Sequence, residues 1–453
     1  MLTRFEATGF KNLVDVRVDF GPFTCIAGPN AVGKSNLLNA IEFLSLLSGN
    51  SFHDACLQVR PTAQRHLDVA SLLSAGVLDG TANLGFAAEM ILPPRAEDEF
   101  GQTVAPSCGY VRYEVEIAAQ QDPTVPGGLR LRLAREQLHA LDDAAGGLRF
   151  PEADACRRLI ARGCSESEGR FLDYQISHGQ GAVIVHREAS GRPRRVLADG
   201  AQRTVLSAVA SAEYPTILAA RTEMSSWRLL ALEPSAMRAP DDLMERRTIS
   251  ASGAHVPAAL YRQNLAAGRD GVVLHRVCDA VAPLVDVRSL TIAEDPVRQA
   301  LELRAQVGDA PELPARALSD GTLRLLTLAA IGVAEDYSGM LCLEEPENGI
   351  HPAKLPELYR LLHGLSTPAA QHLRQVVVNT HSPNLFQCAE AAEVLCAVGR
   401  KTRSGDGTRG EAVDFHPLAG TWRAQGWQGG QGMRPVPRST VQAYLGGPAA
   451  AAD

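Results

Sequence analysis

The segment Gly28–Ser35 constrains the fold of this chain more than any other part of its sequence. It reads GPNAVGKS and fits the pattern GxxxxGK[ST], a glycine-rich turn followed by a lysine and a hydroxyl residue. The apolar run Phe23–Ala27 before it is typical of a buried strand, and Ser35–Leu47 after it has apolar residues at helical spacing. A strand, a glycine loop and a helix in this order predict an α/β fold that binds phosphate groups.

The chemistry of such a loop assigns roles to its residues. Backbone N–H groups surround phosphate oxygens, and the glycines allow the backbone to follow that path. Lys34 supplies a positive charge, and the hydroxyl of Ser35 is a ligand for Mg²⁺. Only four of the 44 basic residues are lysines, so the use of lysine at this position is informative. We expect these residues to hold a nucleotide: Gly28, Pro29, Asn30, Ala31, Val32, Gly33, Lys34, Ser35 and Asn36.

A second segment joins a buried strand to two acids. The apolar residues Met340–Leu343 run directly into Glu344 and Glu345. Open α/β sheets bind their ligands at the carboxyl ends of strands, so these acids are expected beside the phosphate loop. One acid can hold Mg²⁺ and the next can orient or deprotonate an attacking water. The alternative is a solvated acidic loop, which the phosphate loop on the same chain makes the weaker interpretation.

A third segment, Leu318–Thr322, reads LSDGT and precedes a predicted helix over Thr322–Ala334. Ser319 and Gly321 then lie at a helix N-terminus, which is either an anion site or an ordinary helix cap.

A fourth segment is the apolar run Val376–Val378, which leads through Asn379 to His381. A histidine at the end of a buried strand either contacts a γ-phosphate or has a structural role.

Taken together and in this order, the four segments resemble the head of an ABC-type ATPase, with Walker A, signature, Walker B and switch histidine. The sequences GFKN (Gly9–Asn12), LSDGT in place of LSGGQ, EEPENGIHP (Glu344–Pro352) and NTHSPNLF (Asn379–Phe386) are similar to its RecF/SMC-like branch. They look most like the stand-alone ATPases of bacterial defence, which include the overcoming-lysogenization-defect family and the ATPase subunits of the Septu and PARIS antiphage systems. The resemblance covers about residues 1–55 and 310–400.

The resemblance implies an α/β fold, an ABC-ATPase head (P-loop NTPase) with a large insertion between Walker A and signature. It implies ATP and Mg²⁺ as cofactors, and a homodimer or higher even-numbered homo-oligomer whose copies share ATP at their interface. The implied catalytic residues are Lys34, Glu345 and His381, and the implied Mg²⁺ ligands are Ser35 and Glu344. Further implied nucleotide contacts are Lys11 and Asn12, together with Ser319 and Gly321.

The sequence departs from the pattern of that class at two points. The first Walker B acid is Glu344 rather than aspartate, which makes the side chain one methylene longer. A Q-loop glutamine has three candidates, Gln58, Gln120 and Gln121, and the sequence does not choose among them.

The pattern divides the chain into four parts. Residues 1–55 and 311–400 are predicted to form the ATPase head, residues 56–310 an insert of strands and helices, and residues 401–453 a C-terminal extension with a flexible tail. No heptad pattern persists over three repeats, so we expect no long coiled coil.

Composition excludes several classes of protein. The net charge of −7 excludes a strongly basic nucleic-acid coat. The charged N-terminus and the lack of an apolar run of about 18–20 residues favour an unprocessed, cytoplasmic protein without a membrane span. The nine cysteines are scattered without CxxC spacing, which favours reduced thiols over a zinc site.

Two functions from different classes remain compatible with these patterns. The first is an ATP-hydrolysing sensor or scaffold of an antiphage defence complex that controls a separate, nuclease-like effector. The second is a RecF-like repair ATPase that contacts DNA. A transporter ATPase is disfavoured by the long stretch between Lys34 and Ser319, and no DxD follows Phe386 to indicate a Toprim nuclease. A binding-only protein is a weaker interpretation than either of these two functions.

The basic segment His186–Arg195 is an expected hairpin tip. It either binds along the phosphate backbone of DNA or is only exposed to solvent.

Overall fold

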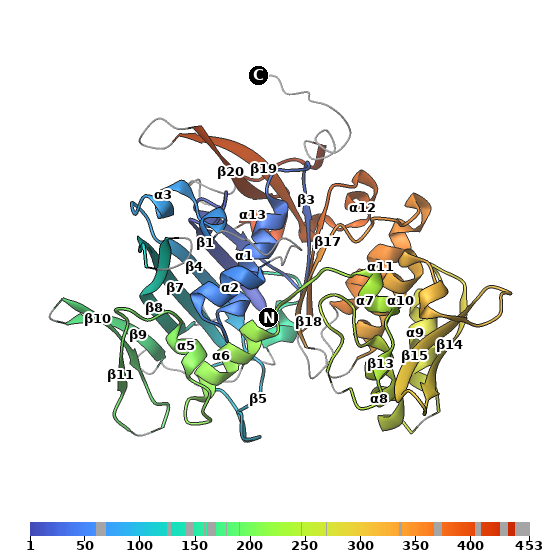
Figure 1. Ribbon diagram of the computed structural model, residues 1–453. Coiled ribbons are helices and arrows are strands. Elements are labelled where there is room, and N and C mark those ends of the chain that lie inside the picture. The colour runs from blue at the N-terminus through green and yellow to red at the C-terminus, as the bar shows by residue number, and fades with distance from the viewer. Residues whose placement is uncertain are drawn as a thin grey trace.

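The computed structural model describes residues 1–59, 69–124, 128–141, 148–157, 160, 169–177, 179–189, 191–245, 247–268, 270–334, 338–366, 374–403, 409–425 and 434–439. Figure 1 shows two lobes on either side of a central sheet. The lobe drawn in blue and green is mostly antiparallel strand, and the lobe drawn in yellow and orange is rich in helices.

The central sheet has six strands in the order β12-β17-β18-β3-β19-β20. Their bounds are β12 (Arg228–Leu230), β17 (Gly339–Glu344), β18 (Arg374–Thr380), β3 (Phe23–Ala27), β19 (Val394–Arg403) and β20 (Arg409–Pro417). Each pair from β12 to β19 is parallel, and β20 is antiparallel to β19. Because parallel strands end at one edge of a sheet, the loops after β3, β17 and β18 meet there.

The second sheet has eight antiparallel strands in the order β11-β10-β9-β8-β7-β4-β1-β2. Their bounds are β1 (Leu2–Thr8), β2 (Val16–Asp19), β4 (Leu84–Ile91), β7 (Tyr110–Gln121), β8 (Leu129–Ala140), β9 (Arg170–Ser177), β10 (Gln180–Val185) and β11 (Arg194–Leu197). Strands of residues 1–55 and of residues 56–310 therefore pair in one sheet. The antiparallel pair β10–β11 confirms the hairpin predicted around the basic segment. A small hairpin joins β5 (Ala96–Glu97) to β6 (Thr103–Val104).

Helix α1 (Lys34–Leu46) lies between the two sheets. Its buried residues Leu37, Leu38, Ile41 and Leu44 share one core with Phe86 of the eight-stranded sheet and Met340 and Cys342 of the central sheet. A helix that is apolar on most of its circumference is stable only when it is covered on both sides, which these two sheets provide.

The other face of the central sheet packs against the helical lobe in a second core. Its helices are α7 (Pro234–Arg238), α8 (Val256–Ala266), α9 (Val272–Val281), α10 (Asp320–Val333), α11 (Leu355–Leu365) and α12 (Pro383–Cys388). A small sheet of β13 (Asp241–Asp242), β14 (Val287–Asp295), β15 (Ala300–Val307) and β16 (Leu313–Pro314) completes this lobe.

The remaining helices and 3₁₀ turns have at most 11 residues each. They are α2 (Phe52–Gln58), α3 (Ala75–Leu78), α4 (Ala153–Arg157), α5 (Val205–Ala208), α6 (Pro215–Ser225), α13 (Trp422–Gln425) and the 3₁₀ turns η1 (Val69–Leu72), η3 (Ala315–Ala317), η4 (Pro352–Lys354) and η5 (Ala391–Glu393). The longest helix in the described ranges is α10 with 14 residues. Within those ranges no helix has both the length and the apolar character needed to cross a membrane. The eight described cysteines are free thiols.

The C-terminal part is described only in pieces. β20 forms an edge of the central sheet, and Val436 pairs with Leu418 in a short parallel bridge. Most of the predicted flexible tail, residues 426–433 and 440–453, lies outside the described residues.

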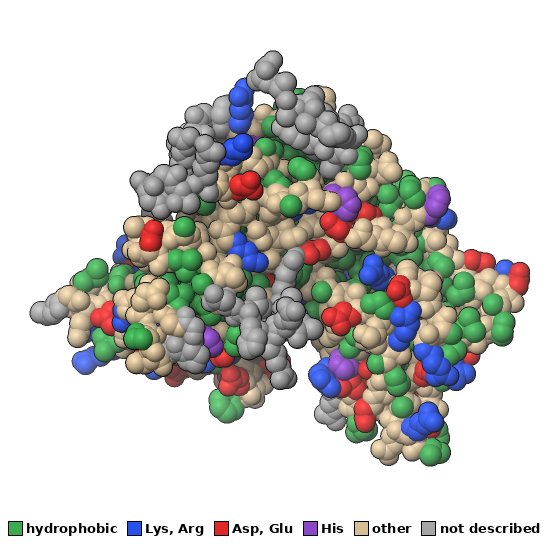
Figure 2. Space-filling view, turned by 45° about the horizontal axis from the view of Figure 1, so that its top comes forward, with side chains coloured by type: hydrophobic (Ala, Val, Ile, Leu, Met, Phe, Trp, Pro, Cys, Tyr) green, Lys and Arg blue, Asp and Glu red, His purple; other side chains and the backbone are tan. Residues whose placement is uncertain are grey.

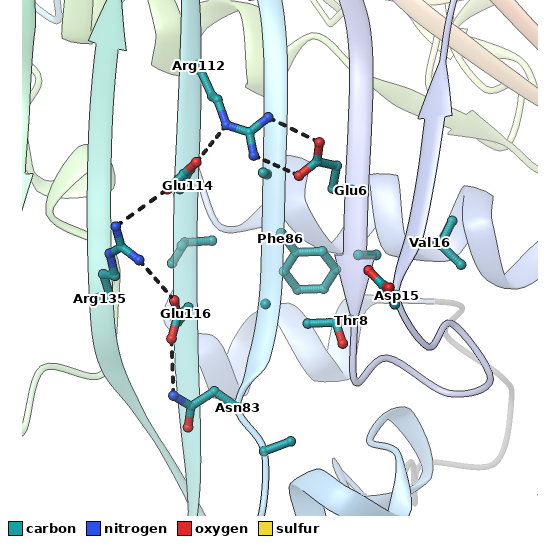
Figure 3. Close-up of a pocket in the computed structure, with 15 residues that line it drawn as sticks. Glu6, Thr8, Asp15, Val16, Asn83, Phe86, Arg112, Glu114, Glu116 and Arg135 are labelled. Atoms are coloured by element: carbon teal, nitrogen blue, oxygen red, sulfur yellow. Dashed lines mark hydrogen bonds and ion pairs between the residues drawn. The ribbon is translucent and has the colours of Figure 1, made fainter. Parts of the chain in front are cut away.

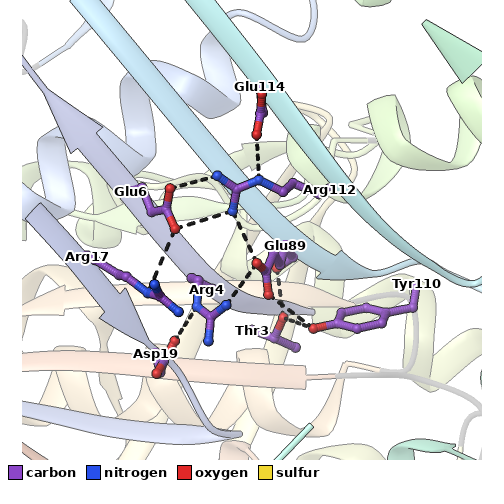
Figure 4. Close-up of polar contacts among 9 residues, drawn as sticks. All are labelled: Thr3, Arg4, Glu6, Arg17, Asp19, Glu89, Tyr110, Arg112 and Glu114. Carbon is purple, nitrogen blue, oxygen red and sulfur yellow. Dashed lines mark hydrogen bonds and ion pairs between the residues drawn. The ribbon is translucent and has the colours of Figure 1, made fainter. Parts of the chain in front are cut away.

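The outer face of the eight-stranded sheet carries a polar network (Figure 4). Alternation along β1 sends Phe5 into the core and leaves Arg4 and Glu6 on the other face. Arg112 joins three neighbouring carboxylates, with nitrogen–oxygen distances of 2.7 Å to Glu6, 3.1 Å to Glu89 and 2.6 Å to Glu114. These ion pairs between neighbouring strands stabilise the register of the sheet.

Gln375 of β18 ties the two sheets together. Its side chain is 1% exposed. Its Nε2 donates to the carbonyls of Leu2 (2.7 Å) and Gly21 (2.9 Å), and its Oε1 accepts from the N–H of Leu2 (3.0 Å). The amide thus satisfies three backbone groups where β1 meets the central sheet.

We predict that Gln375→Ala destabilises the fold by about 2–4 kcal/mol, because three buried backbone groups lose their partner. Urea unfolding followed by circular dichroism measures the loss. The exposed Gln387→Ala is the matched control and should change the midpoint little. Equal midpoints for the two variants would contradict this role of Gln375.

Candidate nucleotide-binding site

The loop between β3 and α1 has the backbone that a phosphate loop requires. Ala31 and Gly33 have φ values of 63° and 112°, so the chain turns through the left-handed region twice. Lys34 begins α1 with its side chain nine-tenths buried or more, and its Nζ donates to the carbonyls of Gly28 (2.8 Å) and Pro29 (2.7 Å). The ammonium of Lys34 therefore lies over the loop, in the position that the sequence motif predicts.

Asn12 supports this loop from the turn after β1. Its Nδ2 donates to the carbonyl of Val32 (3.1 Å), and its Oδ1 accepts from Nδ2 of Asn36 (2.8 Å). A Cβ on Gly33 would lie 2.5 Å from Asn12 Nδ2, so only glycine allows this close approach. The side chain of Asn12 is thus in contact with Walker A and fixes its shape.

Lys11 precedes Asn12 in the same turn and also has a positive φ, 49°. Its N–H donates to the carbonyl of Leu72 (2.9 Å), and its Nζ lies 5.6 Å from the centroid of the Phe10 ring. The structure gives Lys11 a role in holding the turn, and its nucleotide contact stays a prediction.

Glu345 follows β17 with its backbone in the left-handed region, at φ 45°. Its carboxylate is held at both oxygens, by Asn348 Nδ2 on Oε2 (2.9 Å) and by His381 Nδ1 on Oε1 (2.9 Å). A strained backbone and two side-chain partners fix the direction of this acid. The structure therefore brings Glu345 and His381 together, as the sequence predicted from two separate segments.

Asn379 joins the acids to the phosphate loop. Its Oδ1 and its backbone carbonyl both accept from the N–H of Glu345 (3.0 and 3.1 Å), and its Nδ2 donates to Ser35 Oγ (3.3 Å). The sequence patterns did not single out Asn379 as a site residue. A signal was present, because an amide near the carboxyl end of a buried strand and two residues before a predicted site histidine is well placed to bridge neighbouring loops.

Electrostatics at the site favour a charged carboxylate. Burial acts to raise the pKa of Glu345, but the hydrogen bond from Asn348 and the charges of His381 and Lys34 outweigh it and lower that pKa. Burial lowers the pKa of Lys34, while Glu345, Glu347 and Glu344 act in the opposite direction. Glu345 is thus ionised near neutral pH, as an acceptor of a water proton must be.

The oxygen donors beside the loop fit Mg²⁺. Ser35 is the second residue of the P-loop helix and Glu344 ends the strand next to β18, and hydroxyl and carboxylate oxygens are the ligands that Mg²⁺ prefers. Asn379 Nδ2 donates to Ser35 Oγ, which leaves one lone pair of that oxygen for a metal. The described residues hold no group of three His, Cys, Asp or Glu side chains suited to another metal.

The signature segment lies in the helical lobe. Ser319 caps α10, and its Oγ accepts from the N–H of Thr322 at 3.2 Å, so the predicted cap is confirmed. Arg238 of α7 forms an ion pair with Asp320 and donates to the carbonyl of Leu318 (3.1 Å). The structure does not bring Ser319 into a described contact with the P-loop of the same chain.

The three Q-loop candidates differ in their surroundings. Gln58 ends α2 and donates to Asn50 Oδ1 (3.2 Å). Gln120 and Gln121 lie in the β7–β8 ladder, opposite Arg130 and Leu129. These positions do not identify any one of the three glutamines as the Q-loop residue.

Sheet order and site geometry define the class of fold. Walker A follows β3, Walker B follows β17, and β18 between these two strands ends at the switch histidine. This is a P-loop ATPase fold with the ABC/SMC-like order of motifs, which confirms the predicted fold class.

Comparisons with known proteins agree with this class. Residues 203–387 match a family model described as AAA domain, putative AbiEii toxin, Type IV TA system. That match covers under half of the chain and includes the signature, Walker B and His381. A stretch of 46 residues is 50% identical to the DNA replication and repair protein RecF of Lactobacillus gasseri, and it spans 12% of that protein and 10% of this chain.

The solved structures that the chain matches include heads of SMC proteins. An Smc head bound to the C-terminal winged-helix domain of ScpA is 14% identical, covers 92% of this chain and 98% of that one, and has a TM-score of 0.46. The SMC head domain from Thermotoga maritima is 13% identical over 92% and 98% of the two chains, with a TM-score of 0.34.

We predict that Asn379→Ala lowers ATP turnover about 10- to 100-fold and changes nucleotide affinity much less. The variant removes the side-chain bridge from Ser35 to Glu345, while Lys34 and the loop backbone remain. Turnover by phosphate release and affinity by calorimetry separate the two effects. Asn384→Ala, an exposed asparagine five residues on, is the control. A variant with normal turnover would show that the bridge is dispensable.

Proposed function

We propose that this protein is a Mg²⁺-dependent ATPase whose nucleotide is shared between two copies of the chain. The observation that carries the proposal is the fixed carboxylate of Glu345, which Asn348 and His381 hold and which Asn379 links to Ser35. ATP is supplied by the cytoplasm, where we place the protein.

Each residue of the site has its own role in hydrolysis. The loop amides and Lys34 bind the β- and γ-phosphates, and Lys34 offsets their charge. Glu345 orients a water molecule and accepts its proton, and His381 keeps the carboxylate in position. Mg²⁺, when bound by Ser35 and Glu344, supplies charge stabilisation for the phosphate oxygens.

The position of the signature supports sharing of the nucleotide. Ser319 begins a 14-residue helix in the lobe opposite the eight-stranded sheet. A helix N-terminus carries about half a positive charge, which a γ-phosphate held by a second copy would neutralise. ATP then joins two chains, and loss of its γ-phosphate weakens that contact.

For the biological role we propose a sensor or scaffold in antiphage defence that controls a separate effector. The match to a model of AAA domains described with AbiEii toxins supports this role. The alternative, a RecF-like repair ATPase, has the 46-residue match to RecF in its favour.

Charge at one hollow of the eight-stranded sheet and on one face of the molecule favours the first role. A hollow of about 460 Å³ lies on the outer face of the eight-stranded sheet over Gly85 and Ala87 (Figure 3). Charged side chains around it comprise four acids and two arginines, namely Glu6, Asp15, Glu114, Glu116, Arg112 and Arg135. On the face in Figure 2, acidic and basic side chains are likewise intermixed over both lobes. DNA binding requires a surface with excess positive charge.

The test of the ATPase proposal compares two variants. Lys34→Ala should weaken ATP binding about 10- to 100-fold, because the phosphates lose a charged partner. Glu345→Gln should bind ATP normally and hydrolyse it about 10²- to 10⁴-fold more slowly. Calorimetry with Mg²⁺ and a phosphate-release assay measure both. Equal ATP affinity of wild type and Lys34→Ala would reject the assignment of the phosphate loop.

A mixture of Lys34→Ala with Ser319→Arg tests the shared site in the same assay. Each mixed dimer keeps one intact Walker A facing one intact signature, so part of the activity should return. Mixed oligomers that form and stay inactive would reject independent shared sites. A gel-shift assay with duplex DNA at low salt separates the two biological roles, since only the repair role requires binding.

Arg238 generates a further prediction for this site. Asp320 stands in LSDGT where LSGGQ has glycine, and its ion pair with Arg238 offsets a negative charge beside the proposed phosphate position. We expect Arg238→Ala to lower ATPase activity about two- to fivefold, and the added change Asp320→Asn to restore it. The exposed Arg298→Ala is the control. Failure of Asp320→Asn to rescue would show that Arg238 acts in another way.

A further inference from the structure

A cavity of about 210 Å³ lies at the amino-terminal end of β3, at the end of that strand away from the phosphate loop. Its walls come from segments that are far apart in sequence. They include Phe23 at the start of β3, Phe150, His363 of α11 and Trp422 of α13. None of the residues assigned to the nucleotide site lines it.

The walls of this cavity are aromatic. Phe23 and Phe150 are 4% and 3% exposed, so their positions are fixed by packing. The rings of Phe150 and Trp422 have centroids 6.2 Å apart at an angle of 67°, and those of Phe23 and His363 are 5.5 Å apart. Aromatic faces carry negative potential and attract cations.

Carboxylates supply the polar part of the lining, from Glu152, Glu390 and Glu393. Glu393 accepts from Tyr359 Oη (2.6 Å) and lies 2.9 Å from His363 Nε2. Glu152 and Glu390 are exposed, so their charges can meet a ligand at the rim. The hydrogen bond to Glu393 and the charges of all three acids raise the pKa of His363 against the effect of burial. The three carboxylates therefore act on the same small volume, and where His363 is protonated it offsets one of them and leaves the lining with a net negative charge.

The C-terminal end of a neighbouring helix has the same preference for positive charge. Helix α11 ends at the cavity with Ser366 as its C-cap, and the C-terminus of a helix carries a partial negative charge. The buried guanidinium of Arg423 lies 4.3 Å from the centroid of the Trp422 ring, held by the carbonyl of Asp19 and the hydroxyl of Thr24. This indole thus stacks on one guanidinium within the fold, and the three carboxylates must outweigh the repulsion that the charge of Arg423 exerts on a second cation.

We propose that this cavity binds a single guanidinium group. Its volume is below the roughly 300–1,000 Å³ of pockets for drug-sized ligands, so it fits a group the size of a side chain and not a nucleotide. A planar guanidinium can stack on aromatic rings and donate to carboxylates at its edge, which this lining offers together. The group is carried either by a small free cation or by an arginine side chain of a partner protein.

The experiment titrates the full chain with ethylguanidinium and with N-acetyl-arginine amide, and follows binding by calorimetry and tryptophan fluorescence. Ethylurea and N-acetyl-citrulline amide are the neutral controls of equal shape. We expect both cations to bind and the neutral compounds to bind at least about tenfold more weakly. Stronger binding of the arginine amide identifies a protein partner as the source, and stronger binding of ethylguanidinium identifies a free cation.

Variants locate the binding at this cavity. Glu152→Gln with Glu390→Gln removes two exposed charges, and should weaken guanidinium binding about fivefold or more without changing ATP affinity. Glu411→Gln, an exposed acid on β20, is the matched control. The proposal is overturned by neutral compounds that bind as well as the cations, by tetramethylammonium that binds better, by binding that survives the double variant, or by a wild-type chain that gives no signal at tens of millimolar.

Discussion

The side-chain amide of Asn379 is the contact on which the geometry of the nucleotide site depends. It accepts from the backbone N–H of Glu345 and donates to Ser35 Oγ, so one residue relates Walker B to Walker A. Glu345 has a left-handed backbone that is costly for a residue with a side chain, and a strained conformation persists only where its surroundings determine it. The side-chain amide of Asn379 holds the backbone of Glu345 in this conformation. His381, two residues further along the chain, holds the carboxylate of Glu345.

The positions of the side chains in this contact are well defined because the strands that carry them are closely packed. β3 and β18 are fully buried parallel neighbours over most of their length, and α1 is covered by sheets on two sides. The phosphate loop therefore joins two well-buried elements, β3 and α1. The signature helix belongs to the second core, and the two cores meet only across the central sheet. Such a layout places the phosphate loop and the signature segment in different lobes.

The sequence predicts the parts of this structure in which local and global preferences agree. FTCIA before a glycine loop can only be a buried strand, and Ser319 before an apolar helix is a cap by its own chemistry. β12 was not predicted, because Arg228–Leu230 is too short for a period and becomes a strand only through pairing with β17. The support of Walker A by Asn12 was likewise missed, since a contact between distant turns leaves no local pattern. The cavity at Phe23 joins four segments and has no signature in any one of them.

The order of strands in the central sheet has a consequence for synthesis of the protein. Both neighbours of β3, namely β18 and β19, follow it by about 350 residues or more along the chain. At about 5–20 residues per second, a ribosome needs roughly 20–70 s to pass from β3 to β18, and during that time β3 has no partner in its sheet. Pairing over such sequence separation is also slow once it becomes available. The nascent chain must keep an apolar strand from aggregating, and it acquires a complete nucleotide site only after β17 and β18 have been made.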